Sequence, residues 1–502
     1  MNYDPNNILI NKDNKVSIPH FIHNELIQFS NYDNIRSIPN ICDGFKPVQR
    51  KILYGCIKKK LFNPKDELKV SQLSGYISSL TSYHHGETSM MMSIINMAQN
   101  FIGSNNINLL YPSGQFGSRV LLGSDHASPR YIFTYLNKVT RSIFRDEDDI
   151  ILKYLNDDGA QIEPEHYYGI IPMVLCNGCT GIGSGFSTEI ACYNPIEIVD
   201  NIKYMMEAEY TPNEPKQLKP WYNKFKGRIT DNEFYGVYEV VGDNKVKVTE
   251  LPVGTSIQKY KEILEKLLEK SDFVTDYFNN SSDEDIDFLI TLKNSVKSED
   301  LYKKLHLISK YSINNHHLFN NKGMIKKYTI EEIFKEFYNI RIQKYQERKD
   351  EMLRHLEHEL KVLKYKVLFI QNILDNIIII HRKRKEEIIS KLIELEIPEL
   401  SGDVDGTPSY DYLTNMSLFS LTQDKIEEFD NKYKNKENEI ENIKNTTVFQ
   451  LWTKELDEFL IEYNKMLKIL EEEKQANNKI IKAGANKQVT KAKKTAVKII
   501  KK

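Results

Sequence analysis

The stretch SGQFGSRVLLGSDHASPRYIFTYLNKVTRSIFR, residues 113–145, is the part of the sequence around which the rest of the chain is organised. Gly114, Gly117 and Gly123 stand in its first part, and glycine adopts backbone conformations that strain other residues. The stretch therefore begins as a glycine-rich loop, and a change to regular structure is expected at Ser128.

A helix start is predicted directly after this loop. Ser128 suits the N-cap, and Pro129 suits the first helical position. Tyr131 then falls in the first turn, beside Arg130. The free N–H groups and positive dipole end of a first turn favour phosphate. A tyrosine held there next to a cation is a candidate nucleophile toward a phosphodiester; the alternative is a helix that buries one aromatic ring.

Length and composition indicate a large, folded, charge-rich protein of several domains. The chain has 502 residues, of which 40% are hydrophobic and 28% charged. Its five cysteines show no framework spacing, which favours a reducing, intracellular compartment. No apolar run reaches the length of a transmembrane helix, and the polar start MNYDPNN is not a signal peptide, so no membrane partner is expected.

The charge is unevenly distributed. Residues 476–502 hold nine lysines and no acidic residue, which predicts a disordered tail that binds DNA nonspecifically or acts as a nuclear address. Residues 36–145 hold 14 Lys and Arg against 5 Asp and Glu, although the chain as a whole has a net charge of -1. A basic island around a candidate nucleophile points to a polyanion.

A basic helix precedes the glycine-rich loop. Asp43-Gly44 is a turn signal, and Pro47 can open a helix that carries Arg50 and Lys51. Helix-turn-helix patterns of this kind place a basic helix on DNA. The alternative is a solvated helix face.

The two metal-like motifs lack partners. His84 and His85, in YHHGE, have no further ligand at a useful spacing, and Cys176-x-x-Cys179 has no second pair. Contact with a phosphate is at least as natural for the histidines.

A long helical hairpin is predicted in the C-terminal half. Residues 330–396 form one helical pattern without glycine or proline, and a second runs over 422–474, which suggests an antiparallel coiled coil. Between them, the sequence PSYDYLTNMSLFSLT is an apolar knob and a predicted contact site; the alternative is a local cap. The residues expected to form the knob are Tyr412, Leu413, Met416, Leu418 and Phe419.

Five motifs together resemble the type IIA DNA topoisomerases, in that family's order and at its approximate spacing. They are RSIPNICDGFKPVQRK, YHHGE, SGQFGSR, SPRYIFT and NGCTGIGSGFST, within about 150 residues. The chain is most similar to the eukaryotic and large-DNA-virus branch, whose breakage-reunion half it follows from about residue 18 to 470. The one departure is Pro129, where these enzymes usually have a small helix former.

The resemblance implies roles for particular residues. Tyr131 matches the catalytic nucleophile, with Arg130 and His85 beside the scissile phosphate. Ile182 matches an isoleucine that is wedged between base pairs; the alternative is a core residue. The full set of expected DNA contacts is Arg36, Lys46, Arg50, Lys51, His84, Arg119 and Ile182.

The expected fold class is multidomain α+β. An N-terminal extension (1–24) precedes a winged-helix, helix-turn-helix-like DNA-gate domain with the catalytic tyrosine (25–150). An α/β tower (151–328) follows. The long antiparallel coiled coil with its small C-gate domain (329–475, apex about 397–421) leads to the basic tail (476–502).

The resemblance also implies partners. Double-stranded DNA is the substrate, and a homodimer forms through the C-gate and the DNA gate. Mg²⁺ and ATP are expected on TOPRIM and ATPase domains outside this chain, in cis or in trans, so the chain alone is expected to be inactive. The location would be the nucleus or a cytoplasmic site of viral replication. Alternatives are a noncatalytic DNA-bending architectural protein and a coiled-coil scaffold recruited to chromatin.

Overall fold

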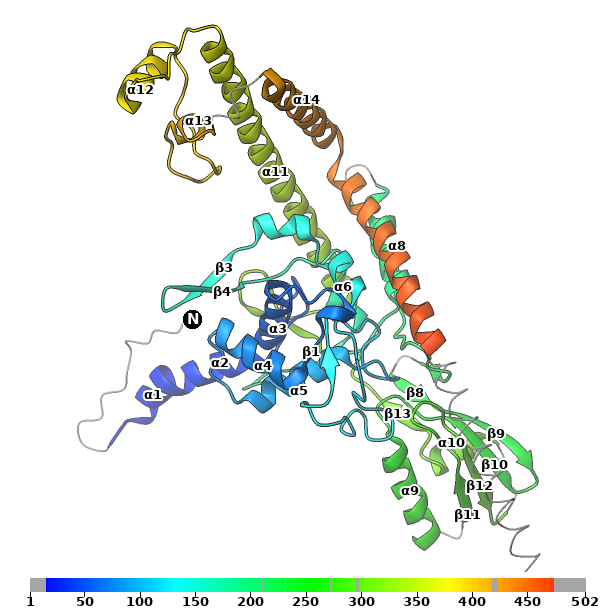
Figure 1. Cartoon of the computed structure of the whole chain (residues 1–502). Helices are drawn as coiled ribbons and strands as arrows, with labels where there is room; N and C mark the ends of the chain where they lie inside the picture. Colours follow the sequence, from blue (N-terminus) through cyan, green and yellow to red (C-terminus); the bar gives the residue numbers. More distant parts are fainter. Residues whose placement is uncertain are drawn as a thin grey trace, which may run out of the picture. The chain divides into compact units, whose positions relative to one another are not determined.

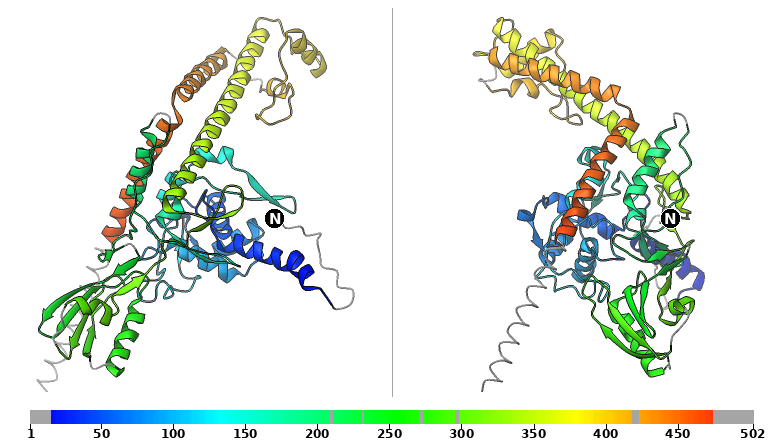
Figure 2. Two further views of the ribbon diagram at one scale, coloured as in Figure 1. Left: turned by 180° about the vertical axis from the view of Figure 1, so that it is seen from behind. Right: turned by 90° about the vertical axis from the view of Figure 1, so that its right-hand side faces the viewer.

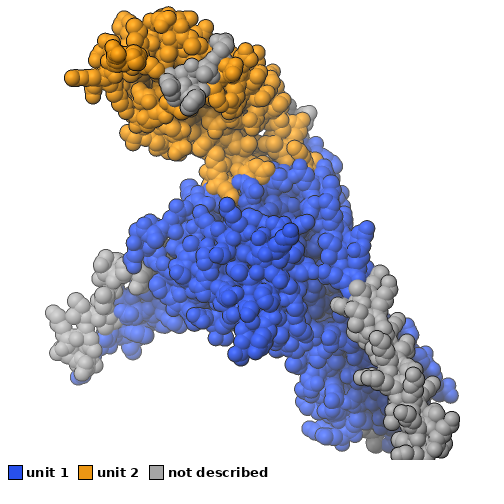
Figure 3. Space-filling model, in the orientation of Figure 1, with its two compact units in different colours: residues 1–146, 152–341, 455–502 blue, residues 147–151, 342–454 orange. Residues whose placement is uncertain are grey.

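The computed structural model describes residues 15–208, 211–230, 232–270, 273–294, 298–417 and 423–473. The chain divides into two compact units, coloured separately in Figure 3. Unit 1 comprises residues 1–146, 152–341 and 455–502, and unit 2 comprises residues 147–151 and 342–454. The expected knob residues Leu418 and Phe419 and the predicted tail lie outside the described residues. Among the described residues, no helix combines the length and apolar composition needed to cross a membrane.

Unit 1 begins with a helical run, drawn in dark blue in Figure 1. It consists of α1 (Ile18–Phe21), the π-helical turn η1 (Ile22–Leu26) and α2 (Ile27–Ser37). The run ends because Ile38 precedes Pro39, and a residue before proline is driven to extended backbone; Ile38 has ψ 127°.

Three helices of the basic island (36–145) then pack against one another: α3 (Pro47–Lys58), α4 (Val70–Leu80) and α5 (Glu87–Ala98). Pro47 opens α3 as predicted. Gly55 lets α3 approach α4 closely, because a Cβ there would lie 2.5 Å from Cγ1 of Ile77. Contacts at this distance leave no room for alanine, so the pairing of these two helices depends on the glycine.

The predicted helix start at Ser128 and Pro129 is wrong. The Tyr131 N–H donates to the Ser128 carbonyl (2.8 Å) in a single turn, and strand β2 (Phe133–Thr134) follows. β2 pairs with β1 (Leu68–Lys69), and Phe133 exchanges backbone hydrogen bonds of 2.9 and 3.1 Å with Ser113. The aromatic and β-branched residues of YIFTY (131–135) fit a pleated, half-buried surface, and this pairing overrides the local capping signal.

A four-stranded antiparallel sheet in the order β11-β12-β10-β9 forms the core of the region that the resemblance identifies as the tower. Its strands are β9 (Val237–Gly242), β10 (Lys245–Glu250), β11 (Val274–Asn279) and β12 (Phe288–Leu292). Helix α9 (Ile257–Lys270) packs on this sheet through Tyr260 and Leu264, both fully buried (Figure 1 and Figure 2). The β9–β10 hairpin turns directly after Gly242, at Gly242-Asp243, a residue pair that is typical of hairpin turns.

Unit 1 also contains further short strands and helices. Their neighbour in the sequence, the 3₁₀ helix η3, belongs largely to unit 2. They include a three-stranded sheet in the order β13-β8-β7 and the hairpins β3–β4, β5–β6 and β14–β15. Their bounds are η2 (Pro64–Asp66), α6 (Lys138–Ile143), η3 (Asp146–Ile151), β3 (Tyr154–Asp157), β4 (Ala160–Pro164), α7 (Met173–Cys176), β5 (Cys179–Ile182), β6 (Ser187–Ile190), α8 (Pro195–Met206), β7 (Arg228–Ile229), β8 (Glu233–Tyr235), α10 (Ser298–Lys304), β13 (Ile308–Lys310), β14 (His317–Phe319) and β15 (Ile325–Lys327).

Unit 2 contains the antiparallel helix pair. α11 (Ile330–Leu374) begins in unit 1 and continues into unit 2, where it pairs with α14 (Gln423–Asn445). The direction follows from two ion pairs: Glu357 contacts Lys444, and Glu359 contacts Lys436, so sequence numbers rise along one helix and fall along the other.

Both predicted long helices are interrupted. α11 ends at Leu374 rather than near residue 396, because Asn376 takes a left-handed conformation (φ 58°). The chain then folds into a small domain with α12 (Lys385–Glu394) and α13 (Asp411–Thr414). The second helix breaks after α14 and resumes over 448–473. Thr447 and Gln450 cap its start reciprocally, with hydrogen bonds of 2.9 and 3.1 Å.

The apolar knob is core rather than surface in the part that is described. Tyr412 and Leu413 are buried with Phe369 and Ile378 in one cluster, and Met416 packs against it. This matches the alternative of a local cap. The exposed apolar side chains of the small domain and the end of α11 are others: Leu368, Leu374, Ile377, Ile379 and Ile393.

Candidate active site

Tyr131 and Arg130 lie together on the surface of unit 1. Tyr131 is 69% exposed, and the guanidinium carbon of Arg130 is 5.4 Å from the centre of its ring. The phenol hydroxyl is therefore accessible to a large substrate, with a cation beside it. The alternative of a buried aromatic ring is excluded.

The N-terminus of α4 supports this turn. The Val70 N–H donates to the Ile132 carbonyl (3.0 Å), and the Ser71 N–H donates to the Pro129 carbonyl (3.2 Å). A positive helix end does lie beside the tyrosine, as the sequence suggested, but it belongs to α4 and not to a helix of the tyrosine's own.

The glycine-rich loop is closed by hydrogen bonds from Gln99, at the end of α5, and by one of its own. The Gln99 side-chain amide donates to the carbonyls of Phe116 (2.9 Å) and Gly123 (3.2 Å). Gly117 has φ +97°, and a Cβ there would lie 2.5 Å from the Gly123 Cα, so only glycine fits. The Ala127 N–H donates to the Gln115 carbonyl (2.9 Å), which ties the loop to the turn at residues 128–131.

Arg119 is not on the surface, contrary to the expected DNA contact. It is 2% exposed, forms an ion pair with Glu250 on β10 and donates to the Leu251 carbonyl (2.6 Å). A buried guanidinium is retained where a carboxylate and carbonyls take up its donors. Arg119 therefore anchors the glycine-rich loop to the four-stranded sheet.

Replacing Arg119 by methionine is expected to lower the free energy of unfolding by about 3–5 kcal/mol, because it leaves the Glu250 carboxylate, 1% exposed, without its cation. Urea denaturation followed by circular dichroism measures this. Arg130→Met, at an exposed arginine, is the control and should stay within about 0.5 kcal/mol. Equal stability of Arg119→Met and the parent chain would contradict the anchoring role.

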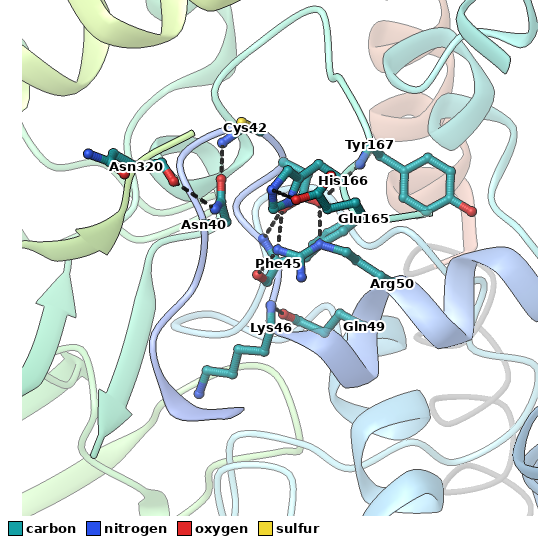
Figure 4. A network of polar contacts seen from close by, with 11 residues as sticks. Asn40, Cys42, Phe45, Lys46, Gln49, Arg50, Glu165, His166, Tyr167 and Asn320 are labelled. Carbon is teal, nitrogen blue, oxygen red and sulfur yellow. Dashed lines mark hydrogen bonds and ion pairs between the residues drawn. The ribbon is translucent and has the colours of Figure 1, made fainter. Parts of the chain in front are cut away.

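Arg50 and Lys51 also have structural partners. Figure 4 shows Arg50, which is buried: its Nε lies 2.6 Å from the Asp43 carboxylate, and its Nη2 donates to the Phe45 carbonyl (2.8 Å). The Lys51 Nζ lies 2.8 Å from the Glu163 carboxylate. Both charged groups are largely buried against acidic partners, so neither matches its expected role on DNA. The acidic partners come from the Asp43-Gly44 turn and from β4, which local patterns do not reveal.

His85 is held in a second cluster. Its Nε2 lies 2.5 Å from the Tyr32 hydroxyl on α2, and its ring packs edge-on against Tyr83 at 5.2 Å between centres. Burial, and then the nearby positive charge of Arg36, lower the pKa of His85, so the imidazole is neutral near pH 7. Arg36 is exposed. Tyr32 was missed by sequence reasoning because 53 residues separate it from His85.

Tyr131 and His85 lie at opposite ends of α4. The N-terminus of α4 holds the 128–131 turn, whereas the Tyr83 N–H donates to the carbonyl of Ser78 near the C-terminus of α4 (3.0 Å). The eleven residues of α4 span about 16 Å at 1.5 Å per residue. His84 is exposed and lies 3.6 Å from the Asp157 carboxylate.

Ile182 is at the tip of the β5–β6 hairpin and is 80% exposed, which excludes the alternative of a core residue. The hairpin packs tightly on α2: a Cβ on Gly183 would lie 2.2 Å from Oδ1 of Asn34. The Asn34 amide donates to the Ser184 carbonyl (3.1 Å), and the Ser184 hydroxyl donates to Asp33 (2.8 Å). The tip is therefore rigidly supported.

Lys46 lies at the base of the same hairpin. Its Nζ donates to the carbonyl of Thr180 on β5 (2.9 Å), and burial lowers its pKa. The Cys179 thiol next to it is free, and burial raises its pKa to about 11. Within the described ranges, no group of three or more His, Cys, Asp or Glu side chains is arranged to hold a metal ion.

Comparison with known proteins supports the resemblance. Residues 36–457 match the family model that describes the A-subunit of DNA gyrase/topoisomerase IV. The chain is 40% identical to DNA topoisomerase 2 of Plasmodium falciparum, over 93% of this chain and 36% of that protein. It is 39% identical to the Saccharomyces cerevisiae enzyme, over 93% and 36%, and 36% identical to that of Acanthamoeba polyphaga mimivirus, over 92% and 42%.

A solved structure agrees with these relatives. The crystal structure of the Plasmodium falciparum topoisomerase II DNA-binding, cleavage and re-ligation domain matches with a TM-score of 0.81 and 40% identity, over 92% of this chain and 66% of that one. The chain spans between 36% and 42% of the length of the three curated relatives named above. The resemblance inferred from five motifs is confirmed, and the chain belongs to the DNA gyrase/topoisomerase IV A-subunit family.

Proposed function

We propose that this chain is the DNA breakage-and-reunion part of a type II DNA topoisomerase, an ATP-dependent isomerase that passes one duplex through a transient break in another. The observation that carries the proposal is the exposed Tyr131 hydroxyl, with Arg130 beside it and the N-terminus of α4 beneath its turn. The family and the matching cleavage domain support it.

The chemistry is a transesterification. The Tyr131 oxygen loses its proton and attacks a DNA phosphorus in line, so a bond from phosphorus to the tyrosine oxygen forms and the bond to the 3′ oxygen breaks. The products are a 5′-phosphotyrosyl bond and a 3′ hydroxyl, which takes up a proton. Arg130 stabilises the charge on the phosphate oxygens. The reverse step reseals the strand without an outside energy source, since the phosphodiester is exchanged and not hydrolysed.

Cofactors are proposed to act from outside this chain. A TOPRIM domain would hold Mg²⁺, which neutralises phosphate charge, and an ATPase domain would bind ATP to drive strand passage, in cis or in trans. DNA breakage and reunion would take place inside the cell, in a nucleus or at a cytoplasmic site of viral replication.

The proposed DNA surface consists of the candidates whose groups remain accessible. Arg36 and His84 are exposed, and Lys46 and His85 are half-buried. Ile182, held out by its hairpin, is the wedge: an apolar side chain that enters a base step bends the duplex. Bending a site of 20–30 base pairs costs on the order of 1–6 kcal/mol, which a rigid support helps to sustain.

We propose that the chain works as a homodimer. Tyr131 and His85 lie at opposite ends of α4 within one copy, and in this proposal the His85 of a second copy completes the site at a shared DNA gate. Two copies also provide the two nucleophiles that a double-strand break requires. A second contact, the C-gate, would form through unit 2.

The test uses the purified chain with and without its complement. Alone, it should bind duplex DNA with an affinity that falls steeply with salt, and neither cleave DNA nor hydrolyse ATP. Adding metal-binding and ATPase parts of a related enzyme with Mg²⁺ should produce denaturant-resistant protein–DNA adducts. Relaxation of plasmid by the chain alone would contradict the division of labour. Binding and bending without adducts under any condition would favour the noncatalytic architectural protein.

A further inference from the structure

Tyr32 makes a contact that the folding of α2 does not require. The residue is 52% exposed, yet its hydroxyl lies 2.5 Å from Nε2 of His85. The two rings are tilted by 33°, with centres 5.9 Å apart. A half-exposed tyrosine whose hydroxyl bonds to a candidate active-site histidine suggests a role in that site.

The direction of this hydrogen bond determines which nitrogen of His85 carries the proton. A neutral imidazole has one N–H donor and one acceptor nitrogen. Burial and Arg36 lower the pKa of His85, so the neutral ring predominates near pH 7. An imidazole nitrogen accepts a hydrogen bond more readily than a phenol oxygen does, so we assign the Tyr32 O–H as the donor to Nε2, and this assignment puts the proton of the ring on Nδ1.

We propose that Tyr32 is a positioning residue for His85. Its hydroxyl fixes the orientation of the ring and its Nδ1–H tautomer, so that Nδ1–H donates a hydrogen bond to an oxygen of the scissile phosphate. This rests on the proposed function. Without the tyrosine hydroxyl, the ring could turn or carry its proton on Nε2, and a ring nitrogen without a proton would face the phosphate and repel it.

Helix α2 places Tyr32 beside a second residue that acts on His85. Tyr32 and Arg36 are four residues apart and therefore share a face of the helix, which is the side from which the Arg36 charge acts on His85. Asp33 and Asn34, on the same helix, hold the hairpin that carries Ile182. One helix thus orients both a phosphate-binding histidine and the apolar wedge.

The first experiment measures the tautomer in the full chain, selectively labelled with ¹⁵N-histidine, by NMR at mildly alkaline pH. His85→Gln identifies the signals. In the parent chain His85 should be the Nδ1–H tautomer, and in Tyr32→Phe it should shift toward Nε2–H, the form that a free imidazole prefers. Tyr83→Phe is the matched control, because Tyr83 packs its ring on His85 without a hydrogen bond to it. An unchanged tautomer in Tyr32→Phe would overturn the proposal.

The second experiment measures the rate of covalent DNA attachment with the complementing domains. Tyr32→Phe should lower it about three- to tenfold, the value of one hydrogen bond, and Tyr83→Phe should not. A changed tautomer with an unchanged rate would overturn the positioning role, and so would a lower rate with an unchanged tautomer. If the parent chain forms no adducts at all, the proposed function fails, whereas the NMR result still reports on Tyr32 and His85.

Discussion

Replacing Tyr131 by phenylalanine should reduce covalent attachment to DNA to background. The phenol oxygen is the atom that would bond to phosphorus, and Arg130 and the N-terminus of α4 cannot act as nucleophiles in its place. Tyr131 is 69% exposed, so the loss of one hydroxyl should leave the fold intact. Denaturant-resistant adducts, formed with the complementing domains and Mg²⁺, are the measurement.

The control for this substitution is Tyr135→Phe, four residues further along the chain. Tyr135 is 8% exposed and stacks on Tyr111, so its ring serves packing. The Tyr135→Phe variant should attach to DNA as the parent chain does. Duplex affinity of Tyr131→Phe should stay within about threefold, because one hydroxyl contributes little to binding. Adducts that persist in Tyr131→Phe would place the nucleophile elsewhere.

The double substitution Ile377→Asp with Ile379→Asp should dissociate the proposed dimer. These residues are 47% and 58% exposed, and Leu374 and Ile393 of the same unit are 43% and 60% exposed. In a two-fold interface each change occurs twice, so four charges would enter an apolar contact. The cost is at least about 3 kcal/mol, or a hundredfold in the dimer dissociation constant. Sedimentation equilibrium measures it.

These exposed residues are chosen in place of the predicted knob, because its residues Tyr412 and Leu413 are buried in the core. Ile313→Asp is the matched control, since Ile313 is 55% exposed but belongs to unit 1. It should dimerise as tightly as the parent chain. A parent chain that is monomeric at micromolar concentration, or a double variant that dimerises normally, would remove the C-gate from unit 2.

Patterns carried by neighbouring residues were predictable from the sequence. Pro47 opens α3, Gly242-Asp243 turns the β9–β10 hairpin, and the absence of glycine and proline allows α11 its 45 residues. Each depends on backbone preferences that act over a few positions. The five motifs likewise identified the family, because they record residue types in order and need no knowledge of their contacts.

The basic residues show what such local patterns cannot predict, namely whether a charged side chain is exposed or buried. Arg36, Arg50 and Arg119 look alike in sequence, and all three stand in the basic island. Only the structure separates the exposed Arg36 from Arg50 and Arg119, which are buried against Asp43 and Glu250. Whether an arginine is available to DNA depends on a carboxylate that can be far away in the chain, 131 residues in the case of Arg119.

By itself, then, the sequence determined the family, the order of the elements and the candidate nucleophile Tyr131. The tertiary structure alone decided that Tyr131 stands on a turn and not in a helix, that α4 provides the helix end beneath it, and that Tyr32 holds His85. The physical reason is that capping preferences amount to about 1 kcal/mol, whereas a buried backbone must satisfy all its N–H and C=O groups. In this protein the carbonyls of Pro129 and Ile132 accept from Ser71 and Val70, and Phe133 pairs with Ser113. No local pattern names these partners.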